Sequence, residues 1–159
     1  MKKYKTGLVI GRFQPFHLGH KFLMEEALKV CEMITIEIGS SNIIDNHNPY
    51  SCEKREKFIE AFINDSGIED RVVGIIPIED DPDDDVWLSK LIESTGKFDV
   101  SIGDNQWVNG IFEKAKIPVV GIGFYRREIL EGTTIRKLMK ERKKWEDRVP
   151  SCLVSTLSE

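Results

Sequence analysis

Short apolar runs alternate with longer amphipathic stretches along this chain, and that alternation limits the fold more than any other feature. Runs rich in β-branched and other apolar residues predict buried strands at 7–10, 34–38, 72–78, 98–102 and 119–122. Apolar residues at helical spacing, or helix-start signals, predict helices at 21–31, 51–64, 85–94, 105–116 and 133–144, with a last short helix near Pro150. Strands that alternate with helices are joined by right-handed crossovers and form a mainly parallel sheet.

The pattern therefore predicts an α/β fold of the Rossmann-like type, with three layers and a mainly parallel central sheet flanked by helices. The 159 residues suit a single domain over 1–159. The formal net charge of -4 gives no basic surplus, so we expect no nucleic-acid partner. The first apolar run is short and ends at Gly11, which predicts neither a signal peptide nor a membrane helix and favours a cytoplasmic protein. Cys31, Cys52 and Cys152 have the spacing of neither a disulfide framework nor a metal site, so we expect free thiols and no protein-held metal.

Ligands of such sheets bind beyond the carboxyl ends of the strands, at the point where the strand order reverses. The loops that follow the predicted strands are therefore the places to search for a site. These loops are 11–20, 39–49, 79–84, 103–105 and 123–132.

The first of these loops carries most of the chemistry. Gly11 closes the first strand, and Gly19 lies where the next helix begins, so backbone N–H groups can approach a phosphate closely. His17 and His20 are three residues apart and face the same way on a first helical turn, with Arg12 as a cation beside them. The alternative is that the two histidines are helix caps or surface residues. Two of the three histidines of the chain in one glycine-flanked loop favour a phosphate site.

A second segment, residues 131–136, repeats this design. Gly132 and Thr133 open a helix, so that backbone amides and a hydroxyl face an anion, and Arg136 lies one turn further on. Thr133 also suits an ordinary helix N-cap, which is compatible with phosphate binding. The two segments together predict that a nucleoside triphosphate is held between two helix starts.

The string Gly11-Arg12-Phe13-Gln14-Pro15-Phe16-His17-Leu18-Gly19-His20 resembles the HxGH signature of the nucleotidyltransferase superfamily, and most closely the archaeal-type nicotinamide mononucleotide (NMN) adenylyltransferases. Glu131-Gly132-Thr133-Thr134-Ile135-Arg136 is similar to the second superfamily motif, Ile-Ser-Ser/Gly-Thr-x-Ile-Arg. The resemblance extends from about Gly7 to Val154. It implies one nucleotidyltransferase domain that transfers AMP from ATP to NMN, giving NAD⁺ and pyrophosphate, with Mg²⁺ bound through ATP, and it implies a homo-oligomer.

The resemblance also implies a role for particular residues. Those expected to act in catalysis are His17, His20 and Arg136. Those expected to bind ATP are Gly11, Arg12, Phe13, Gln14, Gly19, Gly103, Asn105, Gly132 and Thr133. Those expected to bind NMN are Asp80, Asp84 and Trp87. A tryptophan face suits a flat cationic pyridinium ring through stacking and cation–π attraction, although Trp87 also suits a packed core. Trp107 and Trp145 are expected in the core or in a subunit contact.

Three positions depart from the family pattern. Asp104 stands where the family has glycine, and Asp84 replaces an asparagine, where it can still accept a hydrogen bond from the nicotinamide carboxamide. An acidic side chain there favours NMN over its acid form. The segment 45–50 lacks the family's arginine, so His47, Arg126 or Arg127 would have to contact the acceptor phosphate.

Two other functions compete with this interpretation. The first keeps the chemistry with another acceptor, such as pantetheine phosphate, flavin mononucleotide, or a polyol phosphate with CTP. The second is a non-catalytic nucleotide-sensing module. Trp87 argues against the first, and the joint presence of His17, His20 and Arg136 argues against the second.

Overall fold

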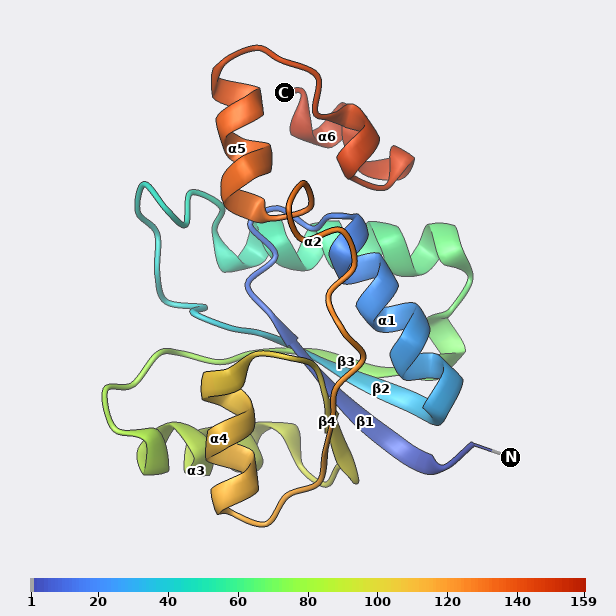
Figure 1. Cartoon of the computed structure of the whole chain (residues 1–159), viewed down its shortest axis with the longest axis vertical. Coiled ribbons are helices and arrows are strands. Elements are labelled where there is room, and N and C mark those ends of the chain that lie inside the picture. Colours follow the sequence, from blue (N-terminus) through green and yellow to red (C-terminus); the bar gives the residue numbers. More distant parts are fainter. Residues whose placement is uncertain (1) are drawn as a thin grey trace.

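The computed structural model describes residues 2–159 and contains a five-stranded parallel sheet (Figure 1). The strands are β1 (Tyr4–Gly11), β2 (Cys31–Ile38), β3 (Val72–Pro77), β4 (Val100–Ile102) and β5 (Val119–Val120). Their order in the sheet is β3-β2-β1-β4-β5, and every neighbouring pair is parallel. The predicted α/β, Rossmann-like architecture is confirmed.

Residues 2–159 form six α-helices: α1 (Leu18–Val30), α2 (Cys52–Ser66), α3 (Asp84–Thr95), α4 (Gln106–Lys114), α5 (Gly132–Lys140) and α6 (Val154–Leu157). Single turns of 3-10 helix lie at Glu69–Arg71, Glu146–Arg148 and Ser151–Leu153. In Figure 1, α1 and α2 cover one face of the sheet, α3 and α4 cover the other, and α5 and α6 lie together beyond α1 and α2. None of the helices in the described part of the chain combines the length and the apolar character that a membrane span requires.

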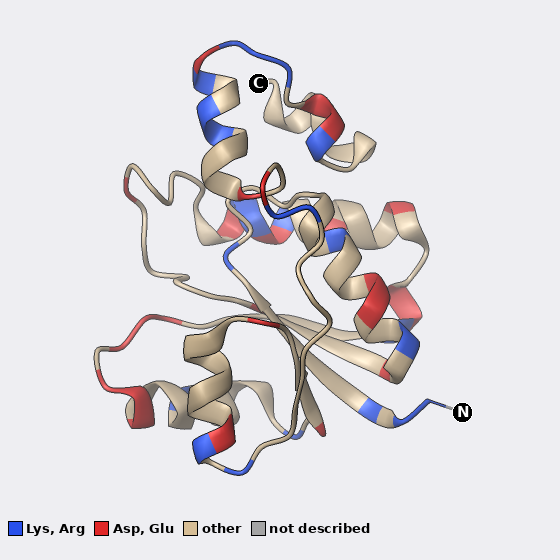
Figure 2. Ribbon diagram, viewed as in Figure 1, with Lys and Arg blue, Asp and Glu red and all other residues tan. Residues whose placement is uncertain are grey.

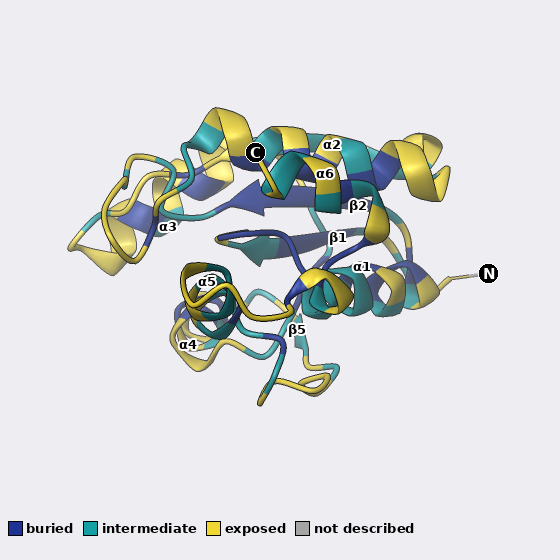
Figure 3. Cartoon of the chain, turned by 90° about the horizontal axis from the view of Figure 1, so that it is seen from above, coloured by how far each residue is buried: buried dark blue, intermediate teal, exposed yellow. Residues whose placement is uncertain are grey.

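Two apolar clusters hold the layers together, one on each face of the sheet. The larger joins β1 and β2 to α1 and α2 through fully buried side chains such as Met24, Ile36 and Phe58. The smaller joins the other face to α3 and α4 through Leu91 and Phe112. The central strands are accordingly the most buried part of the chain (Figure 3). Because both faces of a parallel strand are buried, its sequence is an unbroken run of apolar residues.

Several predicted boundaries are wrong by a few residues. Cys31 begins β2 instead of ending the preceding helix, because α1 stops at Val30 and Cys31 already has extended backbone angles. Arg71 donates hydrogen bonds to the carbonyls of Leu28, Cys31 and Glu32, so a residue far away in sequence fixes this junction. The helix predicted at 133–144 ends at Lys140, and the strand predicted at 119–122 keeps only two residues.

The strand order places a switch point between β1 and β4. The chain leaves β1 towards β2 and β3 on one side, and returns to pair β4 with β1 on the other. The loops after β1 and β4 therefore diverge at their carboxyl ends and leave a crevice between them. The fold alone thus indicates where a ligand binds.

A buried carboxyl group on β2 gives a prediction about stability. Glu37 is fully buried against α3, where the Thr95 hydroxyl donates a hydrogen bond to one carboxyl oxygen, and Oε2 has no partner among residues 2–159. Burial raises the pKa of Glu37 from 4.5 to about 7. Between those two pH values the unfolded chain has lost a proton that the folded chain keeps, so this group makes the free energy of unfolding fall as the pH rises.

We therefore expect the Glu37→Gln variant to be more stable than the wild type at pH 8, by about 1 to 3 kcal/mol, and equally stable at pH 4. Urea unfolding at pH 4, 6 and 8 measures this difference. Glu32→Gln, at an exposed position on the same strand, is the control and should change little at any pH. A stability difference that is constant with pH would contradict the assignment.

Candidate active site

A pocket of about 970 Å³ opens at the carboxyl ends of the strands. Its walls come from the loops after all five strands and from the first turns of α1 and α5. Most of the residues selected from the sequence line it, namely Gly11, Arg12, Phe13, Gln14, His17, Gly19, His20, Asp80, Trp87, Gly103, Asn105, Gly132, Thr133 and Arg136. Asp84 does not line this pocket; it lies in a separate shallow depression between α3 and α4.

His17 and His20 form a reciprocal cap at the start of α1. His17 is the N-cap residue, and its Nδ1 accepts a hydrogen bond from the Gly19 backbone N–H at 3.0 Å. The Nδ1 of His20 accepts from the His17 backbone N–H at 3.1 Å. An Nδ1 atom that accepts carries no proton, so both neutral rings hold their proton on Nε2. The cap thereby fixes the tautomer and leaves two Nε2–H donors for the pocket.

Burial keeps both rings neutral near pH 7. It lowers the pKa of His17 from 6.5 to about 4. Burial lowers the pKa of His20 as well, and the neighbouring His17 lowers it further. The ring of His20 lies 3.8 Å from that of His17 and 4.6 Å from that of Phe13, measured between centroids. The pair therefore offers hydrogen-bond donors of fixed direction, and the positive charge of the site must come from arginines.

Gly19 is required by this arrangement. A Cβ atom at position 19 would lie 2.7 Å from Cε1 of His17, well inside van der Waals contact. The HxGH spacing thus has a steric reason: the glycine makes room for the first histidine to fold over the start of the helix.

Arg136 joins α5 to the first loop. Its Nη1 donates to the Gln14 carbonyl at 2.5 Å and its Nη2 to Thr133 Oγ1 at 3.4 Å. The Gln14 side chain is buried and pairs in both directions with the backbone of Tyr50, at 3.1 and 3.0 Å. Gln14 therefore positions the loop through its side chain, and it also lines the pocket.

Gly132 lies against the same carbonyl, which gives a prediction. A Cβ there would approach the Gln14 oxygen to 2.7 Å and Arg136 Nη1 to 3.0 Å, so either the loop or α5 must move. We expect Gly132→Ala to lower both activity and stability, the latter by about 1 to 2 kcal/mol. Gly110→Ala is the matched control, because that helical position has open space around it and alanine should stabilise α4 by about 0.5 to 1 kcal/mol. Thermal unfolding of both variants measures the contrast, and equal effects would contradict it.

The loop after β4 is held by its own side chains. Asn105 caps α4 by accepting from the Val108 N–H, and Asn109 donates to the Gly103 carbonyl. Asp104 accepts from the Ile122 N–H at 3.1 Å and so links this loop to the chain after β5. A Cβ at Gly121 would meet Asp104 Oδ1 at 2.6 Å, so that glycine accommodates the aspartate.

Two tryptophans form one wall of the pocket. Trp87 is 3% exposed and belongs to the core cluster against α4, while Trp107 is 53% exposed, and their ring centroids are 5.4 Å apart. Both reach the pocket. Trp107 does not lie in the core, because the first turn of α4 directs it outwards, and a subunit contact, the other expectation for this residue, stays a prediction. Trp145 is buried in a small cluster with Ile135 and Val149, as expected.

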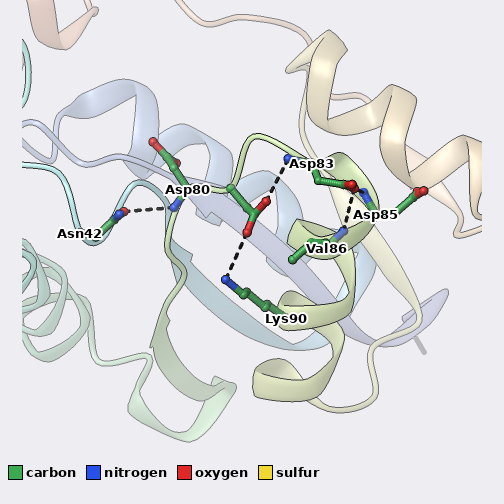
Figure 4. A network of polar contacts seen from close by, with 7 residues as sticks. Asn42, Asp80, Asp83, Asp85, Val86 and Lys90 are labelled. Carbon is green, nitrogen blue, oxygen red and sulfur yellow. Dashed lines mark hydrogen bonds and ion pairs between the residues drawn. The ribbon is translucent and has the colours of Figure 1, made fainter.

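The acidic loop before α3 is held by hydrogen bonds to α3 and to the loop after β2 (Figure 4). Asp83 caps α3, Asp81 pairs with Lys90 at 3.2 Å, and the Asp80 N–H donates to Asn42. Asp80 and Asp81 line the pocket. Figure 2 shows this acidic loop well separated from the Lys and Arg residues of α5 and the turn that follows it.

Residues 8–138 match the cytidylyltransferase-like family. The chain is 35% identical over 156 residues to the nicotinamide-nucleotide adenylyltransferase of Methanocorpusculum labreanum, which covers 98% of this chain and 91% of the relative. It is 34% identical to the enzyme of the same name from Methanolobus tindarius, over 98% of this chain and 88% of that one. The chain belongs to the cytidylyltransferase-like family. Like these archaeal relatives, it is a nucleotidyltransferase.

Solved structures agree with this assignment. A bifunctional NMN adenylyltransferase/ADP ribose pyrophosphatase from Francisella tularensis superposes with a TM-score of 0.80 at 26% identity. The match covers 94% of this chain and 45% of that one, so this nucleotidyltransferase spans less than half of the bifunctional protein. Another structure of that protein, with a TM-score of 0.75, was determined with AMP and a Mn ion.

The pocket of the nucleotidyltransferase suits phosphates better than a protein-held metal. Residues 2–159 contain no group of three or more His, Cys, Asp or Glu side chains that could hold a metal ion. The N–H donors and cations near the two helix starts suit phosphate oxygens, and the carboxylate of Glu131 at the start of α5 is paired with Arg127. A divalent ion carried by the triphosphate fits this donor set, because such an ion takes most of its ligands from phosphates and water.

The segment 45–50, which lacks the family's arginine, contains an asparagine whose role was not predicted from the sequence. Asn48 is buried, and its Oδ1 accepts from Arg12 Nη1 at 3.3 Å, so it orients that cation. His47 is exposed and does not reach the pocket. Of the two arginines proposed instead, Arg127 lines the pocket and pairs with Glu131 at 2.7 Å, whereas Arg126 lies outside it.

Arg55 was not predicted as a functional residue, although its position in the sequence of α2 is unusual for a charged side chain. It precedes Phe58 and Ile59 by three and four residues, so it lies on the apolar face of α2, where a charged residue is out of place. The side chain is fully buried and donates to four backbone carbonyls.

Proposed function

We propose that this chain is a nicotinamide-nucleotide adenylyltransferase, which transfers AMP from ATP to NMN to give NAD⁺ and pyrophosphate. The observation that carries the proposal is the convergence of two Nε2–H donors, from His17 and His20, with Arg136 and Arg12 in one pocket at the switch point of the sheet. The archaeal relatives that match nearly the whole chain have this activity in their names.

The reaction needs position and charge stabilisation, with no protein nucleophile. An oxygen of the NMN phosphate attacks the α-phosphorus of ATP in line, and a new P–O bond forms. The bond from the α-phosphorus to the oxygen that bridges to the β-phosphorus breaks, and pyrophosphate leaves with that electron pair. His17 and His20 donate hydrogen bonds to phosphate oxygens whose charge grows in the transition state. Arg136 and Arg12 hold the leaving pyrophosphate.

Mg²⁺ is the divalent ion we propose, bound to ATP and neutralising its phosphate oxygens. The backbone at Gly11, Gly19, Gly132 and Thr133 lines the triphosphate side of the pocket, and the Gly103 to Asn105 loop lines the side proposed for adenine. A cytoplasmic location is proposed on the short first apolar run and the pattern of the cysteines, and a homo-oligomer on the family resemblance. Light scattering of the purified protein tests the oligomeric state.

The acceptor ring is proposed to lie against Trp87 and Trp107. Asp80 and Asp81 line the pocket together with these two tryptophans. Negative charge beside an aromatic wall favours a cationic pyridinium and disfavours an added carboxylate. Because Asp84 lies outside the pocket, we assign this selectivity to Asp80 and Asp81 instead.

We therefore expect kcat/KM for NMN to exceed that for nicotinate mononucleotide by about tenfold or more. Steady-state kinetics with each acceptor at saturating ATP measures the ratio. Asp81→Asn should reduce the ratio, while Asp70→Asn, at an exposed position remote from the pocket, should leave it unchanged. Comparable values for the two acceptors in the wild type would contradict the selectivity.

One assay separates the proposed function from its alternatives. The protein is incubated with ATP, Mg²⁺ and each of NMN, pantetheine phosphate and flavin mononucleotide, and with CTP plus a polyol phosphate, while pyrophosphate is followed. Release with NMN supports the proposal. Release only with another acceptor, or ATP binding without release, would replace it with the corresponding alternative.

A further inference from the structure

Arg55 reaches from α2 into the backbone behind the pocket. Its Nη1 donates to the Arg12 carbonyl at 3.1 Å and to the Gly39 carbonyl at 2.9 Å, and its Nη2 donates to the Ser40 carbonyl at 3.1 Å. One guanidinium therefore binds the loop after β1 and the loop after β2 at once. Arg55 itself does not line the pocket, whereas Arg12, Gly39 and Ser40 do.

The planarity of the peptide group makes this contact directional. In a trans peptide the N–H points away from the C=O of the same unit. Carbonyls of Arg12 and Gly39 that face Arg55 therefore turn the N–H groups of Phe13 and Ser40 away from it, and both of these residues line the pocket. Neither N–H donates a hydrogen bond to any residue in the described range 2–159. Two free amides from different loops thus lie at the wall of the pocket, with one cation on their carbonyl side.

The backbone at these two amides is in an unusual conformation. Phe13 has a φ of 55° and Ser40 a φ of 50°, both in the left-handed region that non-glycine residues rarely adopt. Such angles persist only where the surroundings hold them, and they occur in concave groups of N–H donors that bind anions. The residues that Arg55 contacts are the ones next to, or at, these two angles.

The charge of Arg55 is balanced only in part. None of the ion pairs among residues 2–159 involves it, although its side chain is fully buried, and the carboxylate of Asp80 acts on it from beyond ion-pair distance. Burial of an arginine without a directly paired carboxylate is costly, and carbonyl dipoles and a more distant carboxylate compensate for it only in part. An anion bound on the far side of the same peptide groups would supply the missing charge.

We infer that Arg55 is a positioning residue for phosphate binding: it aligns and polarises the peptide groups of both loops, so that the Phe13 and Ser40 amides bind a phosphoryl group of a substrate. This rests on the proposed function, since it names a residue that serves that site. The two backbone amides donate hydrogen bonds to a phosphate in place of the arginine that the segment 45–50 lacks. The phosphoryl group belongs either to the acceptor or to ATP.

Binding measurements test the inference without turnover. We expect Arg55→Met to weaken binding of the phosphoryl donor or acceptor that uses this site by about 10- to 100-fold. Calorimetry with NMN alone and with ATP alone identifies which ligand is affected. In the wild type, inorganic phosphate should shift the backbone amide resonances of Phe13 and Ser40 downfield, and in Arg55→Met those shifts should be lost.

Arg71 provides a matched control. It also donates to three backbone carbonyls, at 2.8 to 3.0 Å, but at the opposite end of β2. Arg71→Met should lower the melting temperature and leave both dissociation constants unchanged. Unchanged affinities in a folded Arg55→Met, or equal losses in the two variants, would overturn the inference.

A second variant covers the case in which Arg55→Met does not fold. Arg55→Lys keeps the charge but cannot reach all three carbonyls, so it should bind phosphate with intermediate affinity, and Arg55→Ala should recover binding on addition of millimolar guanidinium. A lysine variant with wild-type affinity and amide shifts would overturn the inference. If the wild type shows Arg55-dependent phosphate binding but forms no NAD⁺, the proposed function fails while the role of Arg55 stands.

Discussion

Replacing His20 by asparagine should lower kcat by about 100- to 1000-fold while the fold remains intact. Asparagine places an acceptor oxygen near the position of Nδ1, so the cap on the His17 N–H is kept. It has no donor at the position of Nε2, so the hydrogen bond to the developing phosphate charge is lost. Loss of one such fixed donor costs enzymes this magnitude because its effect is largest in the transition state.

The measurement is steady-state formation of NAD⁺, with circular dichroism and the melting temperature as tests of the fold. His47→Asn is the control, because His47 is exposed, lies outside the pocket and is the remaining histidine of the chain. It should retain full activity. A His20→Asn enzyme within a few-fold of the wild type would remove His20 from the transition state.

Replacing Arg136 by methionine should lower kcat/KM for ATP by about 100-fold or more. The guanidinium lines the pocket, where its hydrogen bonds to Gln14 and Thr133 hold it beside the first turn of α5. Methionine removes the charge that holds the leaving pyrophosphate, and it also leaves the Gln14 carbonyl without this donor. Part of the loss is therefore positional.

Two further variants separate charge from position. Arg136→Lys retains the charge but cannot donate to Gln14 and Thr133 at the same time, so we expect an intermediate activity. Lys137→Met, at the next residue of α5, is exposed and outside the pocket, and it should behave as wild type. If Arg136→Met weakened NMN binding and left kcat/KM for ATP unchanged, the assignment of Arg136 to the triphosphate would be wrong.

The contacts of Arg136 include both features that can be predicted from the sequence and a long-range contact that cannot. The motif around Gly132 to Arg136 is readable as a helix start with a cation one turn in, because both features are local. The hydrogen bond from Arg136 to the Gln14 carbonyl, 122 residues away, cannot be predicted from that motif. The hydrogen bonds of the Gln14 side chain to the backbone of Tyr50, 36 residues away, are likewise not visible in the sequence, and its expected contact with ATP stays a prediction.

For the two tryptophans and the acidic loop, the sequence likewise did not show which side chains line the pocket. Trp87 was selected on the family resemblance, and Trp107 was expected in the core, yet Trp107 is the more exposed of the two at the pocket. Asp84 was selected because it stands at the place of the family's asparagine, three residues before Trp87, but the first turn of α3 carries it to another depression. A shift of one helical position changes the face on which a side chain lies.

The layered α/β architecture, the parallel sheet and the place of the pocket at its carboxyl edge could be predicted from the amino-acid sequence. This was possible because the periods of apolar residues, the N-caps and the glycine-flanked histidines are properties of neighbours in the chain. The three-dimensional packing was needed to show which groups line the pocket and which lie behind its walls: the paired neutral histidines in the lining, Arg55 behind two of the loops, and Asn48 beside Arg12. Those arrangements depend on burial and on contacts between distant segments, and these contacts form only when the layers pack against each other.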